Sequence, residues 1–406
     1  MASKILVIGG TGAQGMPIIQ ALVQDKKYSC RVLTRDVASA RAKYLASLGN
    51  VELVEGTFAN EHDLRRAYHG CDGAFVNIDG FNCGEKAEIF WAIRCYELAI
   101  EAGVVFYVYA NLDYAYKKSG YNPLFRAGHY DGKGRVAEFI LAQNSSNKDN
   151  NDNKNGNNNK NNNNDNNGKM NTNTLSSSGS TNSAGTMGVA AFTTGPYIEM
   201  TIGANTPMTP SIEEGDDDGN SAIVTWRVPL GDGAVPHVAL DDCGYYVRWL
   251  FDHPERAHGM DLEVAIEHIR YADLARAFEK VTGHPARYVD VSLEEYWDSG
   301  PMAGSASRGT GYNADPEDAA TMSIKDNFTG FWNMWKYSGG NVGVIQRDYA
   351  LLDEIFPSRI KSAEEWFRRE DELGRKSGKG SLWERVQKGN LKPVMKLVED
   401  RLSGRL

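Results

Sequence analysis

Two hydrophobic patterns alternate along residues 1–143. Short apolar, β-branched runs predict strands, and longer segments with apolar residues at helical spacing predict helices. The expected strands are Ile5–Ile8, Arg31–Thr34, Val51–Val54, Ala74–Val76 and Val104–Tyr109, and the expected helices between them are Pro17–Gln24, Ala38–Leu48, His62–Tyr68 and Ala87–Ala102. This order builds βαβ units, which place parallel strands in one sheet with helices on both faces. The pattern therefore predicts an α/β fold with a doubly wound parallel sheet.

The pattern breaks off after a further expected helix at Gly134–Leu141. Residues 144–186 are mostly Asn, Asp, Lys, Ser, Thr and Gly. Such a segment buries too little apolar surface to offset its loss of conformational entropy. We therefore expect a disordered Asn-rich insertion, which is either a loop without a role or, less favoured, a regulatory or binding segment. A strand at Gly188–Thr193 then resumes the sheet.

These boundaries predict two folded parts. Residues 1–143 and 187–200 form the first domain, and residues 201–406 form a smaller mixed α/β region with a helical tail. In the second part, Asp241–Phe251 has helical spacing. The pairs Ser292 and Glu295, and Ser362 and Glu365, match the capping box that begins a helix.

Two C-terminal segments have alternative interpretations. The loop Pro207–Asn220 carries an acidic run, and its spacing favours a solvated loop over a metal site; the residues are Glu213, Glu214, Asp216, Asp217 and Asp218. Residues 324–337 are rich in aromatic side chains, most of them on one helical face; they are Phe328, Phe331, Trp332, Trp335 and Tyr337. That face favours core packing over a lid on a ligand.

Charge and cysteine content narrow the class of protein. A net charge of −9 opposes general nucleic-acid binding, because phosphate contacts need a basic face. The 5 cysteines are odd in number and lack CxxC spacing, so we expect neither a disulfide framework nor a zinc site. No signal-peptide core and no apolar run of about 20 residues stands out. We expect a cytoplasmic protein, with nuclear entry open, that contacts no membrane.

The first strand leads into a glycine-rich turn, GGTGAQG at residues 9–15. The glycines of the GxxGxxG pattern, Gly9, Gly12 and Gly15, permit a sharp turn, a close approach of the backbone to a pyrophosphate and close packing of the next helix. The start of that helix offers free N–H groups and the positive end of its dipole. Directly after a first strand, this pattern predicts a Rossmann-type dinucleotide site rather than a purely structural turn.

The end of the second strand indicates which dinucleotide binds. NAD-binding domains usually place an acid there to hold the ribose 2′-hydroxyl, and here the segment reads Thr34-Arg35-Asp36. A guanidinium pairs with a 2′-phosphate, so Arg35 indicates NADP(H). The less favoured interpretation is that Arg35 is a surface arginine that contacts no cofactor. Asp36 keeps NAD open, because a shift of one residue would reverse the preference.

Four motifs together resemble the NmrA-like family of atypical short-chain dehydrogenases/reductases. They are GGTGAQG at 9–15, TRD at 34–36, HYDGKG at 129–134 and GPYIEM at 195–200. Two later segments, NFTGFWNMW at 327–335 and RDYALLDEIFPSRIKSAEEW at 347–366, look like fungal members. The family is similar to isoflavone reductases. It includes reductases, and also proteins that bind NADP or NAD without turnover and act as redox sensors and negative regulators of transcription factors.

The resemblance implies a set of cofactor contacts along the chain. It assigns Gly9, Gly10, Thr11, Gly12, Ala13, Gln14, Gly15 and Met16 to the pyrophosphate, Arg35 to the adenosine ribose, Thr57 and Phe58 to the adenine, Asn77, Ile78 and Asp79 to the nicotinamide ribose, and Lys133 with Tyr197, Ile198, Glu199 and Met200 to the nicotinamide. Two features depart from the family. Residues 55–58 read EGTF where an acid is more usual, and the nearest match to a lysine that some relatives carry near Phe90 is Lys86.

Candidate catalytic groups are few. Tyr114 and Lys118 have the YxxxK spacing of typical short-chain dehydrogenases, but turn-forming residues follow them, so we interpret the match as coincidence. Lys133, expected just before the helix at Gly134–Leu141, is the better candidate, because it could hold ribose hydroxyls or polarise a carbonyl. His129 or Tyr130 could supply a proton, although each is more simply structural. No hydrolase or metalloenzyme motif stands out.

Three functions remain open at this point. The first is an NADP(H)-binding nucleotide sensor that regulates a partner such as a transcription factor. The second is an NADPH-dependent oxidoreductase that reduces a small carbonyl or enone, with Lys133 as its catalytic group. The third and weakest is a scaffold that has lost its cofactor. A homodimer is also open.

Overall fold

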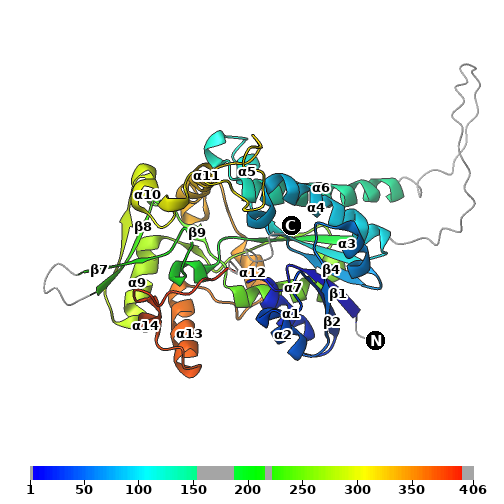
Figure 1. The fold of residues 1–406 in the computed structure, drawn as a ribbon, viewed down its shortest axis with the longest axis horizontal. Coiled ribbons are helices and arrows are strands. Elements are labelled where there is room, and N and C mark those ends of the chain that lie inside the picture. Colours follow the sequence, from blue (N-terminus) through cyan, green and yellow to red (C-terminus); the bar gives the residue numbers. More distant parts are fainter. Residues whose placement is uncertain (1–2, 153–186, 215–221, 396–406) are drawn as a thin grey trace, which may run out of the picture.

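A seven-stranded parallel sheet forms the centre of the computed structural model, which describes residues 3–152, 187–214 and 222–395 (Figure 1). The strand order is β10-β6-β5-β4-β1-β2-β3. The strands are β1 (Ser3–Ile8), β2 (Tyr28–Thr34), β3 (Val51–Glu55), β4 (Gly73–Val76), β5 (Phe106–Leu112), β6 (Gly188–Thr194) and β10 (Asp261–Val264). Each neighbouring pair is parallel. The predicted doubly wound parallel sheet is confirmed.

Helices cover both faces of this sheet, as the alternation along β1 shows. Ile5 and Val7 pack toward α1 (Gly15–Val23), α7 (Leu240–Asp252) and α12 (Tyr349–Ile355). Leu6 and Ile8 pack on the opposite face, where the helices are α3 (Glu61–Tyr68), α4 (Gly80–Glu101) and α6 (Gly128–Asp152). Successive side chains of a strand point to opposite faces, so both faces of a parallel sheet become hydrophobic cores. Helix α2 (Ala40–Ser47) lies between β2 and β3 in the chain.

Helix α6 differs from the prediction at both ends. It begins at Gly128 rather than Gly134, and it continues to Asp152, into the segment predicted to be disordered. Glycines within HYDGKG suggested a loop, but the structure uses them for close packing. A Cβ on Gly134 would lie 2.4 Å from the Cβ of Tyr114. The rest of the predicted insertion, residues 153–186, lies outside the described residues.

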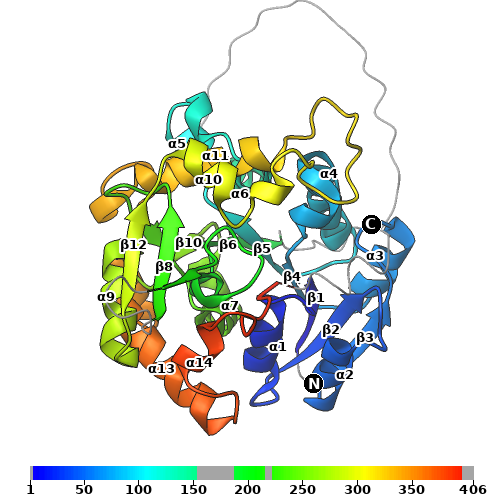
Figure 2. The same cartoon turned by 60° about the vertical axis from the view of Figure 1, so that its left-hand side comes forward.

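The remaining elements form a second layer beside the main sheet (Figure 2). In its sheet, β8 (Ala222–Val228) pairs with β12 (Ala286–Asp290) in parallel and with β7 (Ser211–Glu214) antiparallel, and β9 (Val235–Pro236) pairs with β11 (His268–Ile269). The helices of this layer are α5 (Ala115–Lys118), α9 (Tyr271–Thr282), α10 (Leu293–Ser299), α11 (Ile324–Lys336), α13 (Ala363–Lys376) and α14 (Leu382–Val386), whereas α8 (Pro254–Ala257) packs on the main sheet. Trp226, Trp332 and Trp335 are fully buried in the core of this layer.

Two elements after residue 200 belong to the layer of the main sheet. Strand β10 pairs with β6, and α7 packs on α1. The predicted acidic loop contains β7, and its Glu213 pairs with Arg227 and Arg287. Asp216, Asp217 and Asp218 lie outside the described residues.

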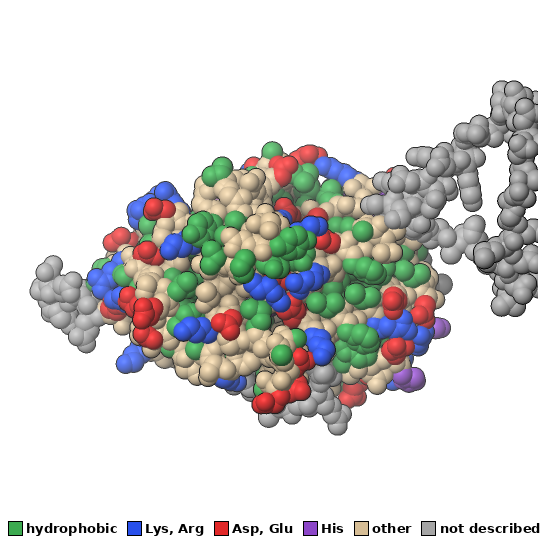
Figure 3. Space-filling model, turned by 90° about the horizontal axis from the view of Figure 1, so that it is seen from above, with side chains coloured by type: hydrophobic (Ala, Val, Ile, Leu, Met, Phe, Trp, Pro, Cys, Tyr) green, Lys and Arg blue, Asp and Glu red, His purple; other side chains and the backbone are tan. Residues whose placement is uncertain are grey.

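The surface over α6 and α11 shows apolar side chains interspersed with charges of both signs (Figure 3). Among the described helices, none is both long enough and apolar enough to cross a bilayer.

Candidate functional site

The candidate site lies where the strand order of the main sheet reverses. Gly9 follows β1 and Asn77 follows β4, the two neighbours at this point, and the Asn77 N–H donates to the Ile8 carbonyl at 3.1 Å. Ligands of open α/β sheets bind at such a switch point, beyond the carboxyl ends of the strands. Here a cavity of about 580 Å³ lies between this edge of the sheet and the C-terminal layer.

The glycines of the turn serve different purposes. Gly9 has φ +80°, and a Cβ on it would lie 2.4 Å from the Asn77 carbonyl oxygen. A Cβ on Gly15 would lie 2.3 Å from the Gly9 carbonyl oxygen, and one on Gly10 would lie 2.8 Å from Ile19 and Val32 side chains. A Cβ on Gly12 would meet only the Gly9 carbonyl, at 3.1 Å. Gly12 therefore keeps the cavity open, whereas the other three permit close packing.

The turn presents donors to the cavity. Gly9, Thr11, Gly12, Ala13 and Gln14 line it, whereas Gly10, Gly15 and Met16 do not. The backbone N–H groups of Ala13 and Gln14 have no hydrogen-bond partner among the described residues. They precede α1 directly. Free N–H groups at the start of a helix suit an anion such as a pyrophosphate.

The predicted adenosine contacts lie together at one end of the cavity. Arg35, Thr57 and Phe58 all line it. Asp36 does not, and its carboxylate instead accepts the Ala38 N–H at 2.8 Å. The Thr57 N–H donates to the carboxylate of Asp63 of α3 at 3.0 Å, which holds this part of the EGTF segment in place.

Lys133 lies in α6, not in the loop expected before it. Its ammonium forms an ion pair with Glu88 Oε1 at 2.7 Å, and it donates hydrogen bonds to the Ile78 carbonyl at 2.7 Å and to Asn77 Oδ1 at 3.3 Å. One ion pair and two hydrogen bonds therefore hold the ammonium in place. Asn77, Ile78, Asp79 and Lys133 line the cavity, as predicted from the resemblance.

Glu88 was missed by the sequence analysis, although it lines the cavity and its side chain is fully buried. Burial raises the pKa of its carboxyl, and Lys133 opposes that shift. Gly80 makes room for the group, since a Cβ there would lie 2.2 Å from Glu88 Oε2. A signal was present in the sequence: Glu88 shares a helical face with the buried Ala92, Cys95 and Ala99.

The four residues assigned to the nicotinamide wall lie in two different places. Tyr197 and Met200 line the cavity. Ile198 packs in the C-terminal core instead, and Glu199 accepts the Leu240 N–H at 2.9 Å where α7 begins. Neither of these two lines the cavity.

Aromatic side chains form part of the cavity wall. Phe81, His129 and Tyr130 line it, together with Phe328 and Phe331 of α11. The aromatic face of α11 therefore contributes both to the core and to the cavity. Trp332 and Trp335 are buried in the core, while Phe328 and Phe331 also line the cavity. Tyr337 belongs to neither, since 55% of its surface is exposed.

His129 is held by α11 across the cavity wall. Its ring Nδ1 lies 2.9 Å from Asn327 Oδ1, and its backbone N–H donates to the same oxygen at 3.3 Å. Burial lowers the pKa of the imidazole to about 4, so the ring is neutral near pH 7.

The other candidate residues, Tyr114, Lys118 and Lys86, lie outside the cavity. Tyr114 and Lys118 do not line it, and the Lys118 ammonium lies 3.1 Å from the Asp113 carboxylate, which agrees with a coincidental YxxxK match. Lys86 pairs with Asp318 at the surface, at 2.7 Å. It therefore does not take the place of the cofactor-facing lysine of some relatives.

The last described residues also reach the cavity, which the sequence analysis did not anticipate. Pro393 and Met395 line it, and the Ala204 N–H donates to the Lys392 carbonyl at 2.9 Å.

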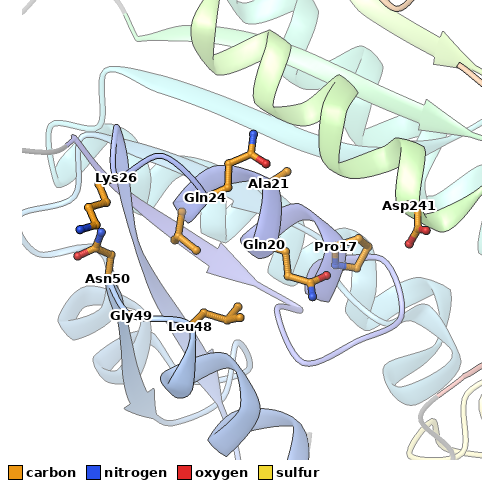
Figure 4. Close-up of a pocket in the computed structure, with 10 residues that line it drawn as sticks. Pro17, Gln20, Ala21, Gln24, Lys26, Leu48, Gly49, Asn50 and Asp241 are labelled. Carbon is orange, nitrogen blue, oxygen red and sulfur yellow. The ribbon is translucent and has the colours of Figure 1, made fainter. Parts of the chain in front are cut away.

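An open hollow beside α1 carries no comparable chemistry (Figure 4). Its charged lining residues, Lys26 and Asp241, are both exposed, and Asp241 pairs with Arg369 at 2.9 Å. We assign no site there.

Comparison with known proteins identifies sequences that are similar to this chain. The model of the NmrA-like family matches residues 1–148 and 188–307. An NmrA-like family domain-containing protein of Dictyostelium discoideum is 26% identical over 301 residues, covering 73% of this chain and 83% of its own. The NmrA-like family domain-containing oxidoreductase malD of Malbranchea aurantiaca is 25% identical over 314 residues, covering 75% and 79%.

A solved structure supports the fold. The crystal structure of NmrA, a negative transcriptional regulator, in complex with NADP matches with a TM-score of 0.60 and 15% identity. The match covers 94% of this chain and 99% of that one.

Proposed function

Since the chain belongs to the NmrA-like family, we propose that it binds NADP(H) in the cavity at the switch point. The observation that carries the proposal is the turn Gly12-Ala13-Gln14, which lines that cavity with an open glycine and with the N–H groups of Ala13 and Gln14, which have no partner in the described part of the chain. An anion is the ligand that such a turn suits, and the pyrophosphate of a dinucleotide supplies one.

The adenosine end of the cavity favours NADP(H) over NAD(H). Arg35 lines it, while the Asp36 carboxylate is engaged with the Ala38 N–H. A guanidinium favours the charge of a 2′-phosphate, whereas a carboxylate at this place would repel it.

We further propose that the protein is a reductase, and place this function ahead of sensing. Phe81, Phe328 and Phe331 line the same cavity as Lys133, and an apolar wall of this kind suits a flat organic substrate. Bound NADPH would supply a hydride to an electrophilic carbon. Lys133 would give up its hydrogen bond to Asn77, hold its ammonium beside the substrate oxygen and stabilise the negative charge that develops there, and a proton from water would then complete the reduction. The relative malD is named an oxidoreductase.

Sensing is the second candidate, and a specific observation favours it. The carboxylate of Glu88 forms an ion pair with Lys133, whose ammonium also donates two hydrogen bonds, and these contacts weaken it as an electrophilic group. NmrA, which has this fold, is a negative transcriptional regulator. In this case a regulatory protein, or a second copy of the chain, would bind one cofactor state in preference to the other.

Oxidation of NADPH separates these functions. The substrates are a panel of flat aromatic carbonyl and enone compounds, and the variants are Lys133→Met and, as a matched control, Lys118→Met. A reductase predicts turnover that falls about 100-fold or more in Lys133→Met and persists in Lys118→Met. Circular dichroism verifies that each variant is folded. Tight NADPH binding without oxidation of any substrate would contradict the reductase and leave the sensor.

A further inference from the structure

The feature that the proposed function leaves unused is the ring of His129. His129 and Lys133 are four residues apart in α6, so they lie on one face of the helix, toward the cavity. His129 therefore borders the aromatic part of the cavity one helical turn away from the candidate catalytic lysine.

The hydrogen bonds of Asn327 fix the orientation of its amide. The backbone N–H of His129 can only donate, so the Asn327 atom that faces it must be the oxygen. That same oxygen lies 2.9 Å from the ring Nδ1 of His129. An amide oxygen only accepts hydrogen bonds, so Nδ1 must carry the ring proton.

This arrangement leaves the other ring nitrogen without a proton. Burial keeps the imidazole neutral, and a neutral imidazole protonated at Nδ1 has a bare Nε2. Among the described residues, no group donates a hydrogen bond to this Nε2. Asn327 of α11 therefore makes the Nε2 atom of His129 a hydrogen-bond acceptor in the cavity wall.

The surroundings of this acceptor are flat and aromatic. The ring centroid of His129 lies 4.9 Å from that of Phe81, 5.2 Å from Phe328 and 6.0 Å from Phe331, and Tyr130 lies 4.8 Å away on the neighbouring position. An apolar enclosure penalises a charged ligand and one whose polar groups remain unpaired.

We propose that His129 determines specificity, accepting through Nε2 a hydrogen bond from an O–H or N–H group on the edge of a flat, uncharged aromatic ligand. This inference rests on the proposed function in placing the ligand beside the cofactor. The preference for a ligand with a hydrogen-bond donor comes from His129 in the cavity wall. A ligand without such a donor would bury the nitrogen unpaired, which weakens binding.

Two probes of nearly equal shape test the preference. 2-Naphthol carries an O–H donor, and 2-methoxynaphthalene has the same rings without it. Isothermal titration measures both, on the protein alone and on the protein with saturating NADP. We expect wild type to bind 2-naphthol about tenfold more tightly. In His129→Phe the two affinities should become equal, with that for 2-methoxynaphthalene unchanged within about twofold.

The variant Asn327→Asp distinguishes control of the His129 ring proton from a purely structural contact. A carboxylate at this position still accepts both bonds, but it favours the charged imidazolium, whose Nε2 donates. The preference for 2-naphthol should fall in this variant, and 2-acetylnaphthalene, which carries an acceptor, should gain affinity. Nitrogen-15 NMR of histidine-labelled wild type should show Nδ1 protonated and Nε2 bare.

The outcomes separate this inference from the proposed function. Equal binding of the two probes by wild type, a preference that persists in His129→Phe, or a protonated Nε2 would each overturn the inference. Failure of NADP to bind would overturn the proposed function, while the preference measured on the protein alone would still decide the assignment of His129.

Discussion

The ammonium of Lys133 lies 2.7 Å from the carboxylate of Glu88, a side chain with no exposed surface. The pair joins α6 to α4 beneath the cavity, with Gly80 against the carboxylate. A carboxylate buried this deeply depends on its partner, since desolvation alone would disfavour its charge.

The two charges should therefore be strongly coupled. We expect Lys133→Met to lower the free energy of unfolding by about 3 kcal/mol, because it leaves Glu88 buried without a cation. The double variant Lys133→Met/Glu88→Met should lose much less than the sum of the two single variants. Urea unfolding of the four proteins measures the coupling energy. Additive losses would show that the pair is not energetically linked.

A second buried pair fastens the C-terminal layer to the main sheet. Asp113 follows β5, and both of its carboxylate oxygens accept from Arg347, at 2.9 and 2.7 Å, with neither side chain exposed. Arg347→Met should lower the free energy of unfolding by about 3–5 kcal/mol, because Asp113 then stays buried with one partner fewer.

Lys118→Met is the matched control for that variant. Lys118 also contacts Asp113, at 3.1 Å, but a third of its side chain is exposed, so its loss should cost no more than about 1 kcal/mol. Equal losses in Arg347→Met and Lys118→Met would contradict the importance assigned to the buried pair.

Much of the fold followed from the sequence because periodicity reports burial. The runs of β1 to β6 are apolar since both faces of a parallel sheet are covered, and the glycine turn was recognisable because it sits between a strand and a helix. The start of α6 was missed for a physical reason. Glycine in a sequence signals a turn, but Gly134 is needed here for close packing against Tyr114.

The site was predictable where it is continuous in the chain and less so where it is assembled in space. Gly12, Arg35, Asn77 and Lys133 follow individual motifs and all reach the cavity. Glu88 and Asn327 act through tertiary contacts with α6, which no local pattern encodes. Ile198 and Glu199 fall on the wrong side of a short turn that carries Tyr197 and Met200 to the cavity.

Acid should destabilise the protein partly through His129. The pKa of its imidazole is about 4 in the folded protein, against about 6.5 in an unfolded chain. The unfolded chain therefore takes up the proton first as the pH falls, and stability is lost between about pH 6.5 and 4. We expect the loss from pH 7 to pH 5 to be about 2 kcal/mol smaller in His129→Phe than in wild type. Urea unfolding measures both losses. If the free energy of unfolding falls by the same amount in wild type and in His129→Phe, His129 does not contribute to the acid sensitivity.

Arg35 should set the preference between the two dinucleotides. Arg35→Ala removes the guanidinium at the adenosine end of the cavity, so the affinity for NADP should fall about tenfold or more while that for NAD changes little. Arg65→Ala, a surface arginine of α3 that pairs with Glu101, is the control and should change neither. If Arg35→Ala weakens both dinucleotides equally, the arginine does not discriminate the 2′-phosphate.

The central claim is that the turn at Gly12 binds a nicotinamide dinucleotide, and calorimetric titration tests it most directly. Wild type and Gly12→Asp are each titrated with NADP, NADPH, NAD and NADH. A side chain at Gly12 meets only the Gly9 carbonyl, so the variant should fold, yet its carboxylate would occupy the place of the pyrophosphate and repel it. We predict that wild type binds NADP and NADPH more tightly than NAD and NADH, and that Gly12→Asp binds none of them. Binding of none by wild type, or unchanged affinity in folded Gly12→Asp, would contradict the account.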